Sequence, residues 1–153
     1  MCKNALARIR YRRVIGPCIL IPYITSSGQS PLLDFLASLE RSEPNCFAKW
    51  CYEQDLLLAH GTDVGAPHWK WLGGGLGEIR WRCGRTRLRI YCSEERDKRV
   101  VMYEGDKKKW MPFSNHDRKK CLSRQTDFRS QGYNQRQRRE LYLSKQPGHA
   151  RNQ

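Results

Sequence analysis

The chain has 153 residues, of which 29 are Lys or Arg and 15 are Asp or Glu, so its net charge is +14. A chain of this length is expected to form one domain that is stable without disulfides or a structural metal. No stretch approaches the roughly 18 apolar residues that a membrane-spanning helix needs, so we expect no membrane association.

The charge is distributed unevenly along the chain. Residues 1–24 carry +5, residues 25–77 carry a net −3, and residues 78–153 carry a net +12. A basic surface binds polyanions because neutralising phosphates releases their counterions. The distribution therefore predicts a nucleic-acid partner. The alternative is a solvated basic surface without a ligand.

The seven cysteines and four histidines show no spacing typical of a metal site. No Cys-x-x-Cys pair is present, and structural zinc requires closely spaced ligand pairs. We therefore expect no metal and no cofactor. We also expect the cysteines to be buried or idle thiols in a cytoplasmic, reducing compartment.

The N-terminal part begins with a basic arm over residues 1–16. Residues 17–24 have the composition of a strand, and Pro22 within them lacks the N–H group that a central strand would donate. The proline therefore places this strand at the edge of a sheet or at a bulge.

Two helices are expected next. Ser30 and Pro31 form a favoured helix start, a capping hydroxyl followed by proline in the first turn. Apolar residues then recur with the spacing of one buried helical face: Leu32, Phe35, Leu36 and Leu39. A second helix is predicted from about residue 42 to His60, with Gly61 as its C-terminal stop.

The hydrophobic period changes to two after a glycine-rich loop over residues 62–75. Strands are predicted over residues 77–83, 87–92 and 99–104, which form an antiparallel meander with one apolar and one cationic face. The inward-facing residues of the first two strands are Ile79, Trp81, Cys83, Leu88, Ile90 and Cys92.

A last helix is expected over residues 114–128, and residues 131–153 are polar and basic, which predicts a disordered tail. The domain itself is expected over residues 17–130. The predicted fold class is α+β: a twisted antiparallel sheet with a helical hairpin on one face and a C-terminal helix.

Several short sequence words in this order resemble the RelE/HigB toxin superfamily, in particular its phage-derived branch. The words are Gly28–Leu36, His60–Gly61, Leu76–Arg80, Arg87–Tyr91, Val100–Tyr103 and Lys107–Lys109. The resemblance implies a RelE-like fold. It also implies a toxin of a type II toxin–antitoxin system, a ribosome-associated endoribonuclease that cuts mRNA. Its partners would be mRNA, the ribosome and an antitoxin, which in such systems can be a helix-turn-helix protein.

The sequence departs from that branch at two positions. Just before the lysine pair the branch commonly has a histidine and a phenylalanine, where this chain has Tyr103 and Gly105. The departure leaves a second hypothesis open, a non-catalytic RNA- or ribosome-binding protein on the same scaffold. A DNA-binding regulator is less favoured because no helix-turn-helix spacing is evident.

RNA carries its own nucleophile, the 2′-hydroxyl next to each phosphate, so a metal-free ribonuclease must mainly align it, stabilise charge and move protons. A guanidinium group suits the stabilisation of this charge because it donates hydrogen bonds to two phosphate oxygens. Arg89 is the first candidate for binding the scissile phosphate and Arg80 the second. Arg82 and Arg87 on the same face are predicted to bind RNA; the alternative is that all four are ordinary solvent-facing arginines.

The proton-transfer candidates are Tyr103 and His116. Tyr103 occupies the position of the family's histidine. His116 is a candidate because an imidazole changes its charge near neutral pH. Tyr91 is a further candidate and is expected to bind RNA by stacking on a base. The run Lys107, Lys108 and Lys109 is predicted to bind the flanking phosphates, and its alternative is a plain surface charge run.

Overall fold

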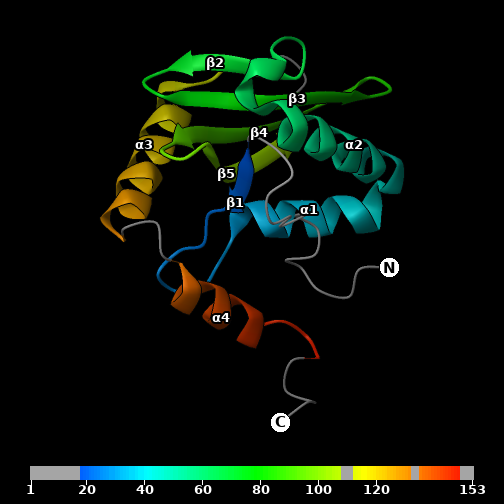
Figure 1. Ribbon diagram of the computed structural model, residues 1–153. Helices are drawn as coiled ribbons and strands as arrows, with labels where there is room; N and C mark the ends of the chain where they lie inside the picture. The colour runs from blue at the N-terminus through cyan, green and yellow to red at the C-terminus, as the bar shows by residue number, and fades with distance from the viewer. Residues whose placement is uncertain (1–17, 108–111, 132–134, 149–153) are drawn as a thin grey trace.

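The computed structural model describes residues 18–107, 112–131 and 135–148 (Figure 1). The predicted basic arm, Lys108 and Lys109 lie outside these residues. The elements in chain order are β1 (Ile19–Pro22), α1 (Pro31–Ser42), α2 (Pro44–His60), the short 3₁₀ helix η2 (Gly61–Val64), β2 (Trp69–Gly73), β3 (Leu76–Cys83), β4 (Thr86–Glu95), β5 (Arg99–Lys107), α3 (Asn115–Ser130) and α4 (Arg136–Ser144).

The strands form one five-stranded sheet in the order β1-β5-β4-β3-β2. β1 is parallel to β5, and the other neighbours are antiparallel. The α+β class, the edge position of Pro22 and the β3–β4–β5 meander are therefore confirmed. The expectation of a wholly antiparallel sheet is wrong, because β1 adds to the free edge of β5 and runs parallel to it.

The α1 helix begins as its sequence predicts. The Ser30 hydroxyl accepts a hydrogen bond from the Leu33 N–H at 3.3 Å, and Pro31 occupies the first turn. Its apolar stripe and that of α2 pack on one face of the sheet, where they form the larger buried cluster with alternate residues of the strands, such as Ile90 and Met102.

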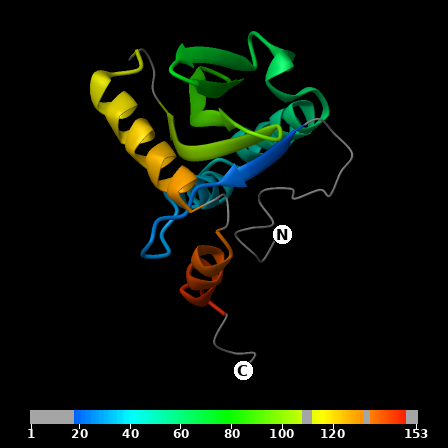
Figure 2. The same ribbon diagram turned by 60° about the vertical axis from the view of Figure 1, so that its left-hand side comes forward.

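The opposite face of the sheet is covered in part by α3 (Figure 2). Strand residues that alternate with those of the first cluster form a second, smaller cluster with α3: Tyr91, Val101, Tyr103, Cys121 and Phe128 are among its members. The prediction of a cationic second face is therefore wrong over the part that α3 covers. The four arginines of the β3–β4 hairpin lie on the same face beyond this cluster.

The segment predicted as a loop over residues 62–75 contains η2 and the strand β2. β2 pairs with β3, and its Trp69 is buried whereas Trp71 is half-exposed. The Trp69 ring packs directly on Gly77 of β3, where a Cβ atom would lie 2.1 Å from the ring. The strand was missed because this contact depends on pairing rather than on local sequence.

Of the six cysteines that the structure describes, two form a disulfide. Cys46 of α2 is bonded to Cys83 at the end of β3, whereas Cys18, Cys51, Cys92 and Cys121 are free thiols. The prediction of buried or idle thiols is therefore wrong for the bonded pair, whereas Cys18, Cys92 and Cys121 are buried thiols as predicted. The bond joins the helical layer to the β3–β4 hairpin.

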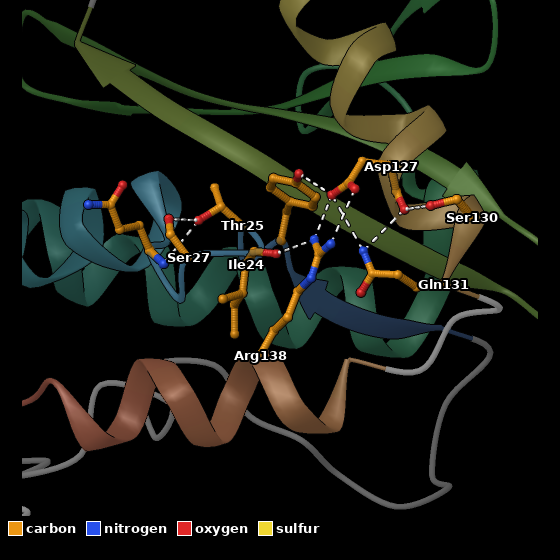
Figure 3. A network of polar contacts seen from close by, with 9 residues as sticks. Ile24, Thr25, Ser27, Asp127, Ser130, Gln131 and Arg138 are labelled. Atoms are coloured by element: carbon orange, nitrogen blue, oxygen red, sulfur yellow. Dashed lines mark hydrogen bonds and ion pairs between the residues drawn. The ribbon is translucent and has the colours of Figure 1, made fainter.

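The predicted disordered tail contains α4, so that prediction is wrong over Arg136–Ser144. Arg138 reaches from α4 to the loop after β1 and to the end of α3 (Figure 3). Its guanidinium donates to both oxygens of Asp127, at 2.5 and 3.2 Å, and to the Ile24 carbonyl at 3.1 Å. Tyr142 is buried in the larger cluster. These contacts attach α4 to the rest of the domain, which the polar composition of residues 131–153 did not predict.

Candidate nucleic-acid site

The four predicted arginines lie on one face of two neighbouring strands. In the register of β3 and β4, Arg80 is directly opposite Arg89, and Arg82 is directly opposite Arg87. Directly opposed side chains have Cβ atoms about 5 Å apart, and like charges in such pairs destabilise a sheet. Two successive arginine pairs therefore form a concentrated cationic surface that an anionic ligand would relieve.

These arginines line a pocket of about 460 Å³ where β2 stops short of the end of β3. The last pair between the two strands is Trp69 with Ile79, so the following residues of β3 border the pocket. Its lining consists of Arg80, Arg82, Arg87 and Arg89 together with Glu53, Ala66, Pro67, His68, Trp81 and Leu88. We call this the arginine pocket. Its volume lies in the range of small-molecule sites.

The arginines differ in exposure. Arg89 is buried, with 9% of its surface exposed, whereas Arg80 and Arg87 are half-buried and Arg82 is exposed. Arg89 faces Arg80 on one side and Asp106 of β5 on the other in the strand register. A buried, position-restricted guanidinium loses less entropy on binding than a mobile one. Of the four arginines, Arg89 is therefore the one whose guanidinium would lose the least entropy on binding an anion.

A carboxylate accompanies the arginines. The buried Glu78 side chain forms an ion pair with Arg80 at 3.3 Å. Burial raises the pKa of Glu78, and the charges of Arg89, Arg80 and Lys70 oppose that rise. Because Glu78 competes with a ligand for Arg80, Arg80 is less available than its sequence position indicated.

A histidine and a glutamate that were not predicted also lie at the arginine pocket. The Nδ1 atom of His68 lies 2.8 Å from Oε2 of Glu53, which is 5% exposed. Burial raises the pKa of Glu53, and the hydrogen bond and charge of His68 oppose the rise. The pair and the four arginines thus line the same pocket.

A signal for Glu53 was present in the sequence. Glu53 follows the buried Trp50 by three residues and precedes the buried Leu57 by four, which places its carboxylate on the apolar face of α2. A carboxylate there requires a polar partner. Nothing local identified His68 as that partner, since the two residues are 15 positions apart.

The two tyrosines are not part of the arginine pocket. Tyr103 is fully buried in the second cluster, and its hydroxyl lies 2.6 Å from that of Ser93. Tyr91 is 2% exposed and packs on Phe113, with ring centroids 4.9 Å apart. Burial raises the pKa of both phenols. Neither ring is accessible for proton transfer or base stacking, because α3 and the segment before it cover this part of the sheet.

His116 and Lys107 lie elsewhere as well. His116 is exposed in the first turn of α3 and is absent from the pocket lining. Lys107 is opposite Leu88 in the register, so it lies on the other face of the sheet from Arg89, where it forms an ion pair with Glu43. The prediction that Lys107 lies beside the cationic face is wrong because a strand alternates its faces residue by residue.

The packing around β5 explains why residue 105 is a glycine. A Cβ atom at this position would lie 2.2 Å from the ring of Phe35, which α1 packs against β5. Any larger residue at position 105 would therefore displace this ring.

No family model and no curated protein matches the chain. Within residues 18–107, 112–131 and 135–148, no helix is long and apolar enough to cross a membrane. In the same ranges, no three His, Cys, Asp or Glu side chains are grouped so that they would hold a metal ion.

Proposed function

We propose that the protein binds RNA at the arginine pocket and cleaves it, as a ribosome-associated mRNA endoribonuclease of the RelE/HigB toxin type. The observation that carries the proposal is the two pairs of opposed arginines on β3 and β4, which line one pocket. Glu53, Glu78 and Asp106 offset part of this charge, Asp106 from its position opposite Arg89 on β5. The sequence words that resemble the phage-derived branch of that family agree with this assignment.

The arginine pocket suits the charge that develops during RNA cleavage. When the 2′-oxygen attacks phosphorus, the phosphorane carries an additional negative charge that arginine donors stabilise. Arg89 would hold a non-bridging oxygen of the scissile phosphate, and Arg80 would assist it. The exposed Arg82 and the half-buried Arg87 would bind the neighbouring phosphates.

The ribosome would supply what a small protein lacks, a message held in an extended conformation with its 2′-hydroxyl aligned. The net charge of +12 over residues 78–153 favours association with ribosomal RNA. This assignment places the protein in the cytoplasm, with an antitoxin as its silencing partner.

The test is induced expression in bacteria, with mapping of new 5′ ends on ribosome-bound message. We expect growth arrest and cleavage, and Arg89→Ala should lower the cleavage rate about 100- to 1000-fold, the cost of removing one transition-state donor. The matched control is Arg85→Ala, which removes one charge from the same hairpin outside the pocket lining. Harmless expression with intact ribosome-bound message would overturn the proposal.

A non-catalytic RNA-binding protein is the second candidate, and one observation favours it. Tyr103, at the family's histidine position, is buried and bonded to Ser93. This candidate predicts RNA binding that weakens with salt, with a slope reduced by about 0.7 in Arg89→Ala for single-stranded RNA, but no cleavage products at any pH.

A further inference from the structure

The ring of His68 is held in a defined orientation at the wall of the arginine pocket. Its Nδ1 atom is hydrogen-bonded to Glu53, and 28% of its side chain is exposed. The other ring nitrogen, Nε2, remains for a ligand. A carboxylate on one nitrogen of a histidine fixes the ring and stabilises its protonated form.

The backbone of His68 is fixed as well. The Arg80 N–H donates to the His68 carbonyl at 2.9 Å, and the His68 N–H donates to the Gly65 carbonyl at 3.0 Å. The next residue, Trp69, is buried. The imidazole is therefore held beside the strand that carries two of the four arginines. A histidine on an unrestrained loop would not keep such a position.

We propose that His68 is the proton-transfer residue of the arginine pocket and that Glu53 positions it, with an RNA phosphodiester as the substrate. This inference rests on the proposed function and deepens it. It assigns the acid–base role to a residue outside the sequence words that resemble the toxin family, in place of the buried Tyr103 and the distant His116.

The reaction is a transesterification without a consumed water. His68 Nε2 takes the proton of the 2′-hydroxyl while the 2′-oxygen forms a bond to phosphorus, and the bond from phosphorus to the 5′-oxygen breaks. His68 then returns the proton to the 5′-oxygen. The products are a 2′,3′-cyclic phosphate and a 5′-hydroxyl. The arginines stabilise the phosphorane, and Glu53 stabilises the transient imidazolium.

Glu53 acts through His68 and is therefore a positioning residue, because its carboxylate is hydrogen-bonded to the Nδ1 atom of the ring. Glu53→Gln should slow cleavage while it leaves RNA binding unchanged, since the imidazole remains but is held less firmly.

The experiment measures RNA cleavage and RNA binding side by side in the full-length protein. His68→Ala should lower the cleavage rate about 100- to 10,000-fold, the range for loss of a general acid–base group, and change binding by less than about threefold. Free imidazole should restore part of the rate in His68→Ala. The matched control is His60→Ala, at the exposed end of α2, which should cleave at the wild-type rate without a gain from imidazole.

The outcomes separate this inference from the proposed function. If wild-type protein cleaves RNA, Arg89→Ala does not, and His68→Ala cleaves at the wild-type rate, the role of His68 is refuted and the nuclease stands. If wild-type protein binds RNA but cleaves none at any pH, both are refuted. Should His68→Ala fail to fold, His68→Gln keeps a polar group near Glu53 and is tested by the same imidazole rescue. A slow His68→Gln variant that imidazole leaves unchanged would refute proton transfer by His68.

Discussion

The disulfide between Cys46 and Cys83 yields a quantitative prediction, because it closes a loop with a sequence separation of 37 residues. In the chain-entropy model, a cross-link of that length removes about 3.8 kcal/mol of freedom from the unfolded chain. We therefore expect reduction to lower the free energy of unfolding by about that amount. With a urea dependence of about 2 kcal/mol/M, the unfolding midpoint should fall by about 2 M.

The assay is equilibrium urea unfolding of the same protein with and without a reductant, which avoids the cavity that a cysteine substitution creates. The control is Cys46→Ala, whose midpoint should not respond to the reductant. An unchanged wild-type midpoint would refute the reasoning. The bond joins α2, which carries Glu53, to β3, which carries Arg80, so reduction also loosens the link between the two sides of the arginine pocket. A reducing cytoplasm would favour the opened form.

Two further predictions concern titratable groups. The Arg138 guanidinium holds the pKa of Asp127 below its ordinary value, so Arg138→Ala should cost about 1 kcal/mol at neutral pH in urea unfolding, a figure that allows for the partial exposure of Asp127. Because the pKa is lowered in the folded state, the difference should be complete above about pH 4 and shrink as the pH falls through the folded pKa, to what the hydrogen bond to the Ile24 carbonyl contributes. A difference of the same size at all pH values would contradict the ion pair. Burial raises the pKa of the Cys18 and Cys121 thiols to about 11. Iodoacetamide at pH 8 should therefore label the less buried Cys51 first, as followed by peptide mass spectrometry, and equal labelling rates would contradict this burial.

The parts of the fold that follow from local spacing could be predicted from the sequence. The helical spacing around Leu36 gave α1, and the period of two gave β3, β4 and β5. The placement of β1 could not be predicted, because Ile19 pairs with Arg99, far along the chain. A short apolar strand can be recognised from its composition. Its neighbour in the sheet and its direction depend on contacts that only the folded chain makes.

In the candidate site too, features that depend on local spacing could be predicted, whereas those that depend on contacts between distant residues could not. The alternation of residues correctly placed the four arginines on one face of two neighbouring strands, since a strand fixes which residues share a face. The same rule wrongly placed Tyr91 in solvent because it does not say what covers a face. The helix that covers it, α3, is largely polar and contributes few buried residues, mainly Cys121 and Phe128. Its sequence therefore gave no indication of a second core.

The two edges of the sheet are unequal in their capacity to accept another strand. At one edge β1 has only four residues and ends in Pro22, which offers no N–H to a neighbour. At the other edge β2 presents the half-exposed Trp71 and lacks a proline. Growth of the sheet by strand addition, in a complex or during aggregation, is therefore directed to the β2 side, next to the mouth of the arginine pocket.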